Sequence, residues 1–85
     1  VKMAKYYIQR VRKDKDDNIT RVQTMRSEFS TQEVVEMIEE SKGFFVVQEG
    51  ATEVEVKLYP REGKKFIRTW KDGEWKNNLD NLPTF

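Results

Sequence analysis

The residue types best suited to bind a partner are aromatic and basic, and they alternate along residues 57–75. Aromatic rings pack in protein interfaces or stack on nucleobases, and Lys and Arg attract carboxylates and phosphates. A two-residue turn at Glu62-Gly63 would pair residue 59 with 66 and residue 57 with 68, which places the set on one face of a sheet. This predicted aromatic–basic face comprises Lys57, Tyr59, Phe66, Arg68, Trp70 and Trp75.

Two registers are possible for the hairpin around Glu62-Gly63. A three-residue loop with Gly63 in a bulge would shift the pairing by one residue, so that Phe66 and Trp70 join the apolar residues 54, 56 and 58 in the core. The shifted register also turns Arg68 inward, which favours the two-residue turn. The sequence does not choose between an exposed aromatic–basic face and a buried one.

The two tryptophans flank Asp72-Gly73, which is a strong signal for a two-residue type I′ hairpin turn. That turn places Trp70 opposite Trp75 in a non-hydrogen-bonded pair, where cross-strand side chains come closest. We interpret the pair first as a structural staple that closes the last hairpin, and second as an aromatic recognition platform.

A second candidate surface is acidic and lies on the predicted helix. Ser30-Thr31-Gln32-Glu33 is a capping box followed by apolar residues at helical spacing, so we predict a helix over residues 31–42 that ends at Gly43. An ordinary solvated face, partly neutralised by basic strands of the same chain, is preferred over a docking site for a basic partner. This predicted acidic docking face comprises Glu33, Glu36, Glu39 and Glu40.

The residue types needed for most catalysis and metal binding are missing. The chain has no His and no Cys, which excludes the commonest general base, the thiolate nucleophile and the usual ligands of transition metals. Asp14, Asp16 and Asn18 match the first ligands of a calcium loop. Ile19 and Met25, however, stand where that loop needs Gly and Glu. The sequence therefore predicts no enzyme, no catalytic residues, no metal and no cofactor.

Eighty-five residues suffice for one small domain, and the net charge of +1 is unevenly distributed along it. Residues 1–26 carry eight basic and three acidic side chains. Residues 27–56 carry one basic and eight acidic, and residues 57–85 carry seven basic and four acidic. Such a pattern either makes a self-complementary surface or presents a basic face to an outside partner. No apolar run is long enough for a membrane span, so we expect a cytoplasmic protein without membrane contact.

The elements that must position these side chains are strands that precede and follow the helix in the sequence. Five segments have the composition or the alternation of strands, namely residues 5–12, 19–25, 44–47, 53–59 and 65–70. Residues 1–3 are expected to be a leader or disordered, and residues 77–85 an irregular closing segment. We predict one α+β domain over residues 1–85, in the order ββαβββ, with one helix packed on one face of a small antiparallel sheet of five or six strands.

Short motifs near both ends of the chain carry a family resemblance. They are Met3-Ala4-Lys5-Tyr6-Tyr7-Ile8, Val11-Arg12, Phe66-Ile67-Arg68-Thr69, Asp72-Gly73 and Asn78-Leu79-Asp80-Asn81-Leu82-Pro83. Over nearly its whole length the chain resembles a family of short bacterial proteins, domain of unknown function 3892. The resemblance implies a bacterial cytoplasmic single domain and supplies no activity and no site residue. On physical grounds, Leu79 and Leu82 are expected to fix the closing segment to the sheet.

The predicted function is a non-enzymatic interaction module that binds an unknown protein, or a second copy of itself, through the aromatic–basic face. One helix covers one face of the sheet, so the other face keeps its aromatic and basic side chains for a partner. Single-stranded nucleic-acid binding, by base stacking beside Lys and Arg, is the alternative. Because the acidic middle segment disfavours polyanions, protein association ranks first.

Overall fold

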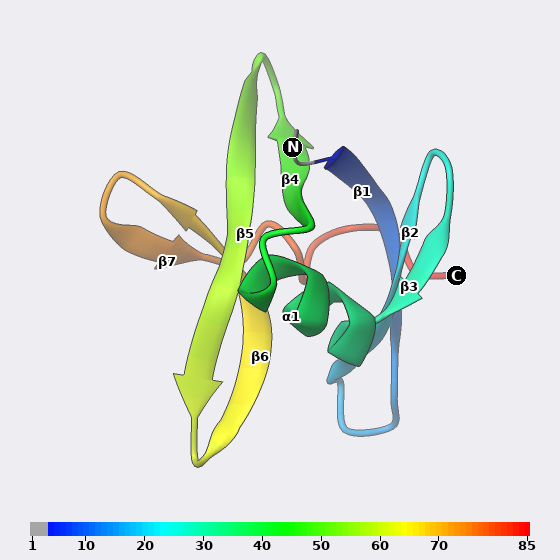
Figure 1. Ribbon diagram of the computed structural model, residues 1–85. Coiled ribbons are helices and arrows are strands. Elements are labelled where there is room, and N and C mark those ends of the chain that lie inside the picture. Colours follow the sequence, from blue (N-terminus) through cyan, green and yellow to red (C-terminus); the bar gives the residue numbers. More distant parts are fainter. Residues whose placement is uncertain (1–3) are drawn as a thin grey trace.

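The computed structural model describes residues 4–85, which form one curled sheet of seven strands and one helix (Figure 1). The spatial order of the strands is β3-β2-β1-β4-β5-β6-β7. The leader predicted at residues 1–3 lies outside the described residues. The elements are β1 (Ala4–Lys13), β2 (Ile19–Thr24), β3 (Glu28–Ser30), α1 (Thr31–Glu39), β4 (Gly43–Glu49), β5 (Thr52–Arg61), β6 (Lys64–Lys71) and β7 (Glu74–Lys76).

The sheet differs from the prediction in the number and direction of its strands. Two three-residue strands, β3 and β7, bring the total over residues 4–85 to seven instead of five or six. The second half of β1 pairs antiparallel with β2, but its first half, residues 4–7, pairs parallel with β4. The parallel pair arises because α1 carries the chain across the sheet and returns it beside β1 in the same direction. The fold is therefore a mixed sheet with one helix, and the prediction of a purely antiparallel sheet is wrong.

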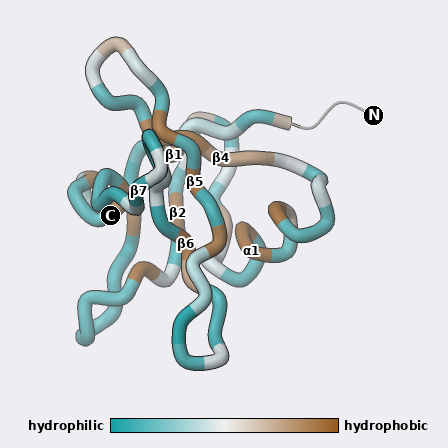
Figure 2. The backbone as a smooth tube through the Cα atoms, turned by 90° about the vertical axis from the view of Figure 1, so that its left-hand side faces the viewer, coloured by the Kyte–Doolittle hydropathy of each residue, from teal (hydrophilic) through white to brown (hydrophobic). Residues whose placement is uncertain are grey.

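The hydrophobic core joins the helix to the strands. Val34 and Val35 of α1 are buried against the sheet, and β4 is the central strand, with Phe45, Val46 and Val47 at most 4% exposed. In Figure 2 the helix and the C-terminal end of the chain lie on opposite sides of the strands. The core cluster comprises Ile8, Val11, Val22, Val34, Val35, Phe45, Val47, Val56, Ile67 and Leu79.

Helix α1 begins as predicted. The Ser30 hydroxyl accepts a hydrogen bond from the Glu33 backbone N–H at 3.1 Å, and Glu33 Oε1 accepts one from the Ser30 N–H at 2.9 Å. Both halves of the capping box are therefore present, and two backbone donors that the helix cannot satisfy internally have partners.

The end of the helix corrects the prediction. Helix α1 stops at Glu39, before the predicted end at Gly43, and Ser41, with φ of 56°, takes the left-handed conformation that a glycine usually takes after a helix. Gly43 opens β4 instead, where an added Cβ would lie 3.1 to 3.2 Å from Met37 of the helix and from two residues of β1. Glycine is needed here because a side chain would prevent the close approach of the helix and the strand, and not because the backbone makes a left-handed turn.

Two-residue turns set the register of the last two hairpins. Glu62-Gly63 has φ values of 51° and 75°, and Asp72-Gly73 has 53° and 80°, as type I′ turns require. The two-residue alternative is confirmed, and the shifted register that would bury Phe66 and Trp70 does not occur. The resulting pairs include Tyr59 with Phe66, Lys57 with Arg68, and Trp70 with Trp75.

The closing segment, residues 77–85, is irregular, as predicted, and it is attached to β1. The Val11 N–H donates to the Pro83 carbonyl at 2.9 Å, and the Phe85 N–H donates to the Val11 carbonyl at 3.1 Å. Leu79 is 2% exposed in the core, and Leu82 is half-buried against it. The prediction that these two leucines fix the segment is confirmed.

Candidate functional site

The structure brings the six residues of the aromatic–basic face together on β5, β6 and β7. They lie on the face of the sheet opposite Val54 and Val56, because residues two apart along a strand share a face and the cross-strand pairs join the three strands. Lys57 is exposed and the other five residues are half-buried. The aromatic residues are therefore packed at the surface and not in the core.

Three of the rings form a packed cluster. The Trp75 ring meets Trp70 at a centroid distance of 4.8 Å and an angle of 79°, and it meets Tyr59 at 4.9 Å and 77°. These are edge-to-face contacts, which aromatic pairs favour. Lys57 Nζ lies 5.7 Å from the Trp70 centroid, and Arg68 Cζ lies 5.1 Å from that of Tyr59, so each cation is held beside a ring.

The cations of this face lack acidic partners. Across residues 4–85, no ion pair involves Lys57 or Arg68, nor Arg61 and Lys64 at the end of the same hairpin. Other cations of the chain are paired, as in Lys76–Glu74 at 2.9 Å. Arg61 and Lys64 continue the alternation of Tyr59 and Phe66, so the same pattern could have predicted them. None of these four cations therefore lies within ion-pair distance of an acidic side chain among the described residues.

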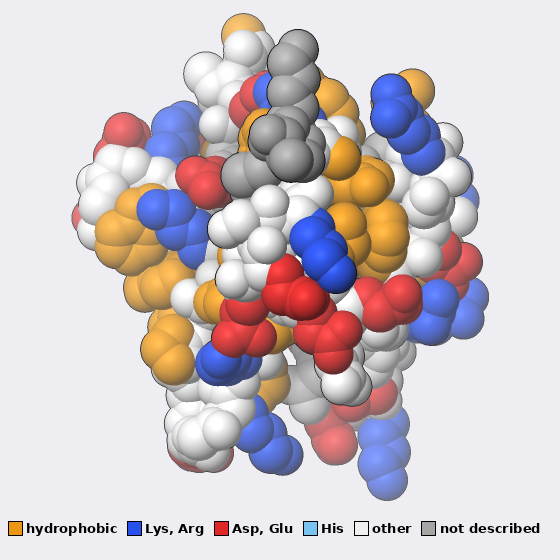
Figure 3. All heavy atoms as spheres, viewed as in Figure 1, with side chains coloured by type: hydrophobic (Ala, Val, Ile, Leu, Met, Phe, Trp, Pro, Cys, Tyr) orange, Lys and Arg blue, Asp and Glu red, His pale blue; other side chains and the backbone are white. Residues whose placement is uncertain are grey.

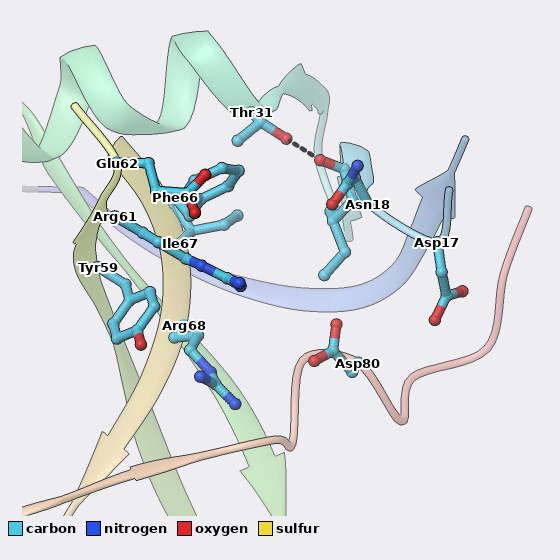
Figure 4. Close-up of a pocket in the computed structure, with 11 residues that line it drawn as sticks. Asp17, Asn18, Thr31, Tyr59, Arg61, Glu62, Phe66, Ile67, Arg68 and Asp80 are labelled. Atoms are coloured by element: carbon cyan, nitrogen blue, oxygen red, sulfur yellow. Dashed lines mark hydrogen bonds between the residues drawn. The ribbon is translucent and has the colours of Figure 1, made fainter. Parts of the chain in front are cut away.

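A cavity of about 480 Å³, here called the β6 cavity, adjoins this face at β6. It lies between the β5–β6 hairpin, the turn that joins β1 to β2, the start of α1 and the closing segment (Figure 4). No sequence pattern predicts this cavity, because its walls come from segments far apart in the chain. Its lining residues are Asp17, Asn18, Ile19, Thr31, Tyr59, Arg61, Glu62, Phe66, Ile67, Arg68 and Asp80.

Charge is unevenly distributed around the β6 cavity. Figure 4 shows the guanidinium groups of Arg61 and Arg68 extending into the space from the β5–β6 hairpin, with the Asp80 carboxylate facing them from the closing segment. Asp17, beyond Asp80, is 3.5 Å from Lys13 and is thereby partly neutralised. The hairpin side of the cavity, here called the cationic wall, carries Arg61 and Arg68 together with Glu62, and the opposite wall carries Asp17 and Asp80.

The four glutamates of the predicted acidic docking face are exposed on α1, where Figure 3 shows acidic side chains gathered with basic ones beside them. Glu39 pairs with Lys65 of β6, Glu40 lies 3.4 Å from Lys42, and Glu36 accepts a hydrogen bond from Gln32. Glu33 belongs to the capping box, where the bonds from the backbone N–H and the hydroxyl of Ser30 lower its pKa. Because cations of the chain itself lie against two of the four, a solvated face accounts for this surface.

The partial calcium motif forms the turn between β1 and β2. Asp14 Oδ1 accepts hydrogen bonds from the backbone N–H groups of Asp16 at 2.9 Å and Asn18 at 3.0 Å, and the bonds lower the pKa of Asp14. Asp17 adopts a φ of 65° within the turn. The carboxylate of Asp14 thus organises the backbone of a hairpin. Within residues 4–85, no cluster of three or more Asp and Glu side chains is placed to hold a metal ion.

A polar network that sequence patterns did not indicate lies across β1 and β5. Lys5 Nζ is 2.5 Å from Glu53 Oε1, and the Tyr7 hydroxyl donates to the other carboxylate oxygen of Glu53. Hydrogen bonding from Lys5 and then Tyr7 lowers the pKa of Glu53, and the bond to Glu53 raises the pKa of Lys5. Because Lys5 and Glu53 are paired with each other, the network connects two strands and leaves no unpaired charge to bind a ligand.

The fold and its site define a small curled-sheet domain that carries an aromatic–basic face and a cavity beside it. The chain belongs to the family described as protein of unknown function (DUF3892), whose model matches residues 7–83. The resemblance drawn from the terminal motifs is thereby confirmed. Comparison with curated proteins and with solved structures finds no match. Among residues 4–85, no helix has the length and apolar character needed to cross a membrane.

Proposed function

We propose that this protein is a non-enzymatic interaction module that binds an acidic protein partner through the aromatic–basic face. The observation that carries the proposal is the group of four cations without acidic partners among the described residues, set around half-buried aromatic rings. Aromatic residues and Arg are enriched in protein interfaces, where rings supply apolar area and cations supply complementarity to carboxylates.

The packing of the rings favours a protein partner over a nucleic acid. Base stacking needs open, flat ring faces, whereas Trp70, Trp75 and Tyr59 meet edge to face and Lys57 and Arg68 lie beside two of the rings. Single-stranded nucleic acid is the second candidate, because unpaired Lys and Arg beside tryptophans are also what such ligands use.

The chain has a built-in reporter for this test, because its two tryptophans both lie in the aromatic–basic face. Tryptophan emission should change when a short oligoglutamate peptide is titrated into the purified protein, and the affinity should fall as salt is raised. An oligothymidylate of similar length tests the second candidate. Sedimentation of the protein alone tests association between copies.

Charge reversal then locates the site. Lys57→Glu should weaken oligoglutamate binding about tenfold or more, while Arg26→Glu, at an exposed cation in the turn between β2 and β3, should leave it unchanged. Equal losses in both variants would mean attraction to net charge alone. Binding of oligothymidylate with no response to oligoglutamate would replace the proposal with the nucleic-acid function.

A further inference from the structure

The outer edge of β6 is only partly covered. Strand β6 has eight residues, Lys64–Lys71, but β7 pairs only with its last three, Thr69 to Lys71. On the other side, β5 pairs with residues 64–70 of β6. Over residues 64–68, no strand of the described chain pairs with the outer edge of β6.

The alternation of an antiparallel ladder identifies the backbone groups that are free. Residues that flank a two-residue turn exchange both hydrogen bonds, so residues 64, 66 and 68 point their N–H and C=O groups toward β5. The N–H and C=O groups of Lys65 and Ile67 therefore point outward. Pro60 lies opposite Lys65, where the ladder needs no N–H from it.

The β6 cavity lies along this open edge. Phe66, Ile67 and Arg68 of β6 line one of its walls, and Asn18 and Ile19 line another. A sheet edge with free donors and acceptors beside a cavity is the arrangement that accepts an extended peptide as an added strand.

We propose that an extended segment of the partner adds to the sheet as a strand along residues 64–68 of β6, and this inference rests on the proposed function. Side chains of an added strand alternate between the two faces of the sheet. On one face they would meet Arg61, Arg68 and Lys64, which attract carboxylates, and on the other they would lie beside Ile67 and Ile19. The partner segment is therefore one in which acidic and apolar residues alternate.

The chain itself contains a strand of this composition. In β5, Glu53-Val54-Glu55-Val56 alternates acidic and apolar residues, and Glu55 lies opposite Trp70 on the aromatic–basic face while Val56 lies opposite Thr69 on the buried face. Only Glu55 and Val56 of this run pair with β6, and along residues 64–68 the inner edge of β6 faces the basic and apolar residues 57–61. An acidic and apolar strand on the outer edge would therefore place its carboxylates beside cations supplied by both β5 and β6.

The test uses a blocked peptide of alternating Glu and Val, with a peptide of the same composition in two blocks as its control. On binding of the alternating peptide, hydrogen exchange followed by NMR should slow about tenfold or more at the Lys65 and Ile67 amides. The amides of residues 64, 66 and 68 are already bonded to β5, so they serve as internal controls and should change little. Tryptophan emission reports binding at the face in the same samples.

Backbone methylation of the peptide gives a second measurement that needs no variant of the protein. In an added strand only alternate amides face β6, so methylating the amides of one residue type should abolish binding and methylating those of the other should spare it. Equal tolerance of both methylated peptides would overturn strand addition.

The Asp80 carboxylate supplies a test by gain of affinity. Because it faces the cationic wall, Asp80→Asn should tighten binding of the acidic peptide several-fold, while Asp72→Asn, in the turn between β6 and β7, should not. A peptide that changes tryptophan emission without protecting Lys65 and Ile67 would overturn strand addition and leave the interaction function standing. No response to either acidic peptide or to oligoglutamate would overturn both.

Discussion

Ser30 and Glu33 hold the start of α1 through two reciprocal hydrogen bonds. Replacing Ser30 by Ala removes the acceptor for the Glu33 N–H, which leaves a helix donor without its partner. We expect Ser30→Ala to lower the free energy of unfolding by about 0.5–2 kcal/mol, measured by urea denaturation. Ser27→Ala, at an exposed serine in the preceding turn, is the matched control and should change little. Equal stability of the two variants would show that the cap is unimportant.

The Glu33 carboxylate makes the contribution of this cap depend on pH. Hydrogen bonds from Ser30 lower the pKa of Glu33 below its ordinary value of 4.5. A carboxyl group whose pKa is lower in the folded state stabilises that state above its unfolded pKa, and the stabilisation disappears as pH falls through the folded pKa. The stability difference between wild type and Glu33→Ala should therefore be full at neutral pH and shrink below about pH 4.5. Unfolding curves at several pH values test this, and a constant difference would contradict it.

Close packing explains why residue 43 is a glycine. An added Cβ would be 3.2 Å from the Ala4 carbonyl oxygen, which belongs to the parallel ladder and cannot move freely. We expect Gly43→Ala to destabilise the fold by about 1–3 kcal/mol, as overpacking does. Met37→Ala in the same chain should recover little of this loss, because the backbone contact persists. Unchanged stability of Gly43→Ala in urea would disprove the crowding.

At the scale of the element, the β6–β7 hairpin makes a spectroscopic prediction. The indoles of Trp70 and Trp75 are 4.8 Å apart and nearly perpendicular, so their transitions should couple and give a split band in circular dichroism. Trp70→Phe or Trp75→Phe should remove the band and keep an aromatic ring in the pair. A wild-type spectrum without the split band, or one that survives either substitution, would show that the rings do not hold this geometry in solution.

Local turn chemistry explains why the β5–β6–β7 region is predictable from sequence. Glu62-Gly63 and Asp72-Gly73 set the register, and the register decides which side chains share a face. The predicted aromatic–basic face therefore matches the structure in all six members. Arg61 and Lys64 follow from the same alternation, but no neighbouring feature of the sequence draws attention to them.

Long-range pairing explains what could not be predicted. The parallel pair of β1 and β4 joins residues 4–7 to residues 43–46, and no local pattern records which edge of β1 the returning chain will take. The β6 cavity likewise combines Asp17, Arg68 and Asp80 from three separate segments. The end of α1 was predicted wrongly because a glycine after a helix usually marks a left-handed cap, whereas here Ser41 takes that conformation.

At the scale of the whole molecule, the closing segment completes the core. Leu79 is 2% exposed and packs in the core cluster, whereas Leu82 is only half-buried. Leu79→Ala should reduce the free energy of unfolding by about 2–5 kcal/mol, and Leu82→Ala by clearly less. Urea denaturation of both variants measures the difference. Similar small losses in both would mean that the segment packs loosely and does not belong to the cooperative unit.

The attachment of the closing segment to β1 also bears on synthesis of the chain by the ribosome. Arg12 and Phe85 are 73 positions apart. At a synthesis rate of about 5–20 residues per second, the edge of β1 that later binds the closing segment therefore stays unpaired for roughly 4–15 s. During that interval the backbone of Val11 is an open edge that a neighbouring nascent chain could pair with. Arg10 and Arg12 flank Val11 and repel the same strand of another copy. In the finished fold Arg12 donates to the Phe85 carbonyl and lies beside the Phe85 ring, so a charge that disfavours pairing between copies also holds the closing segment.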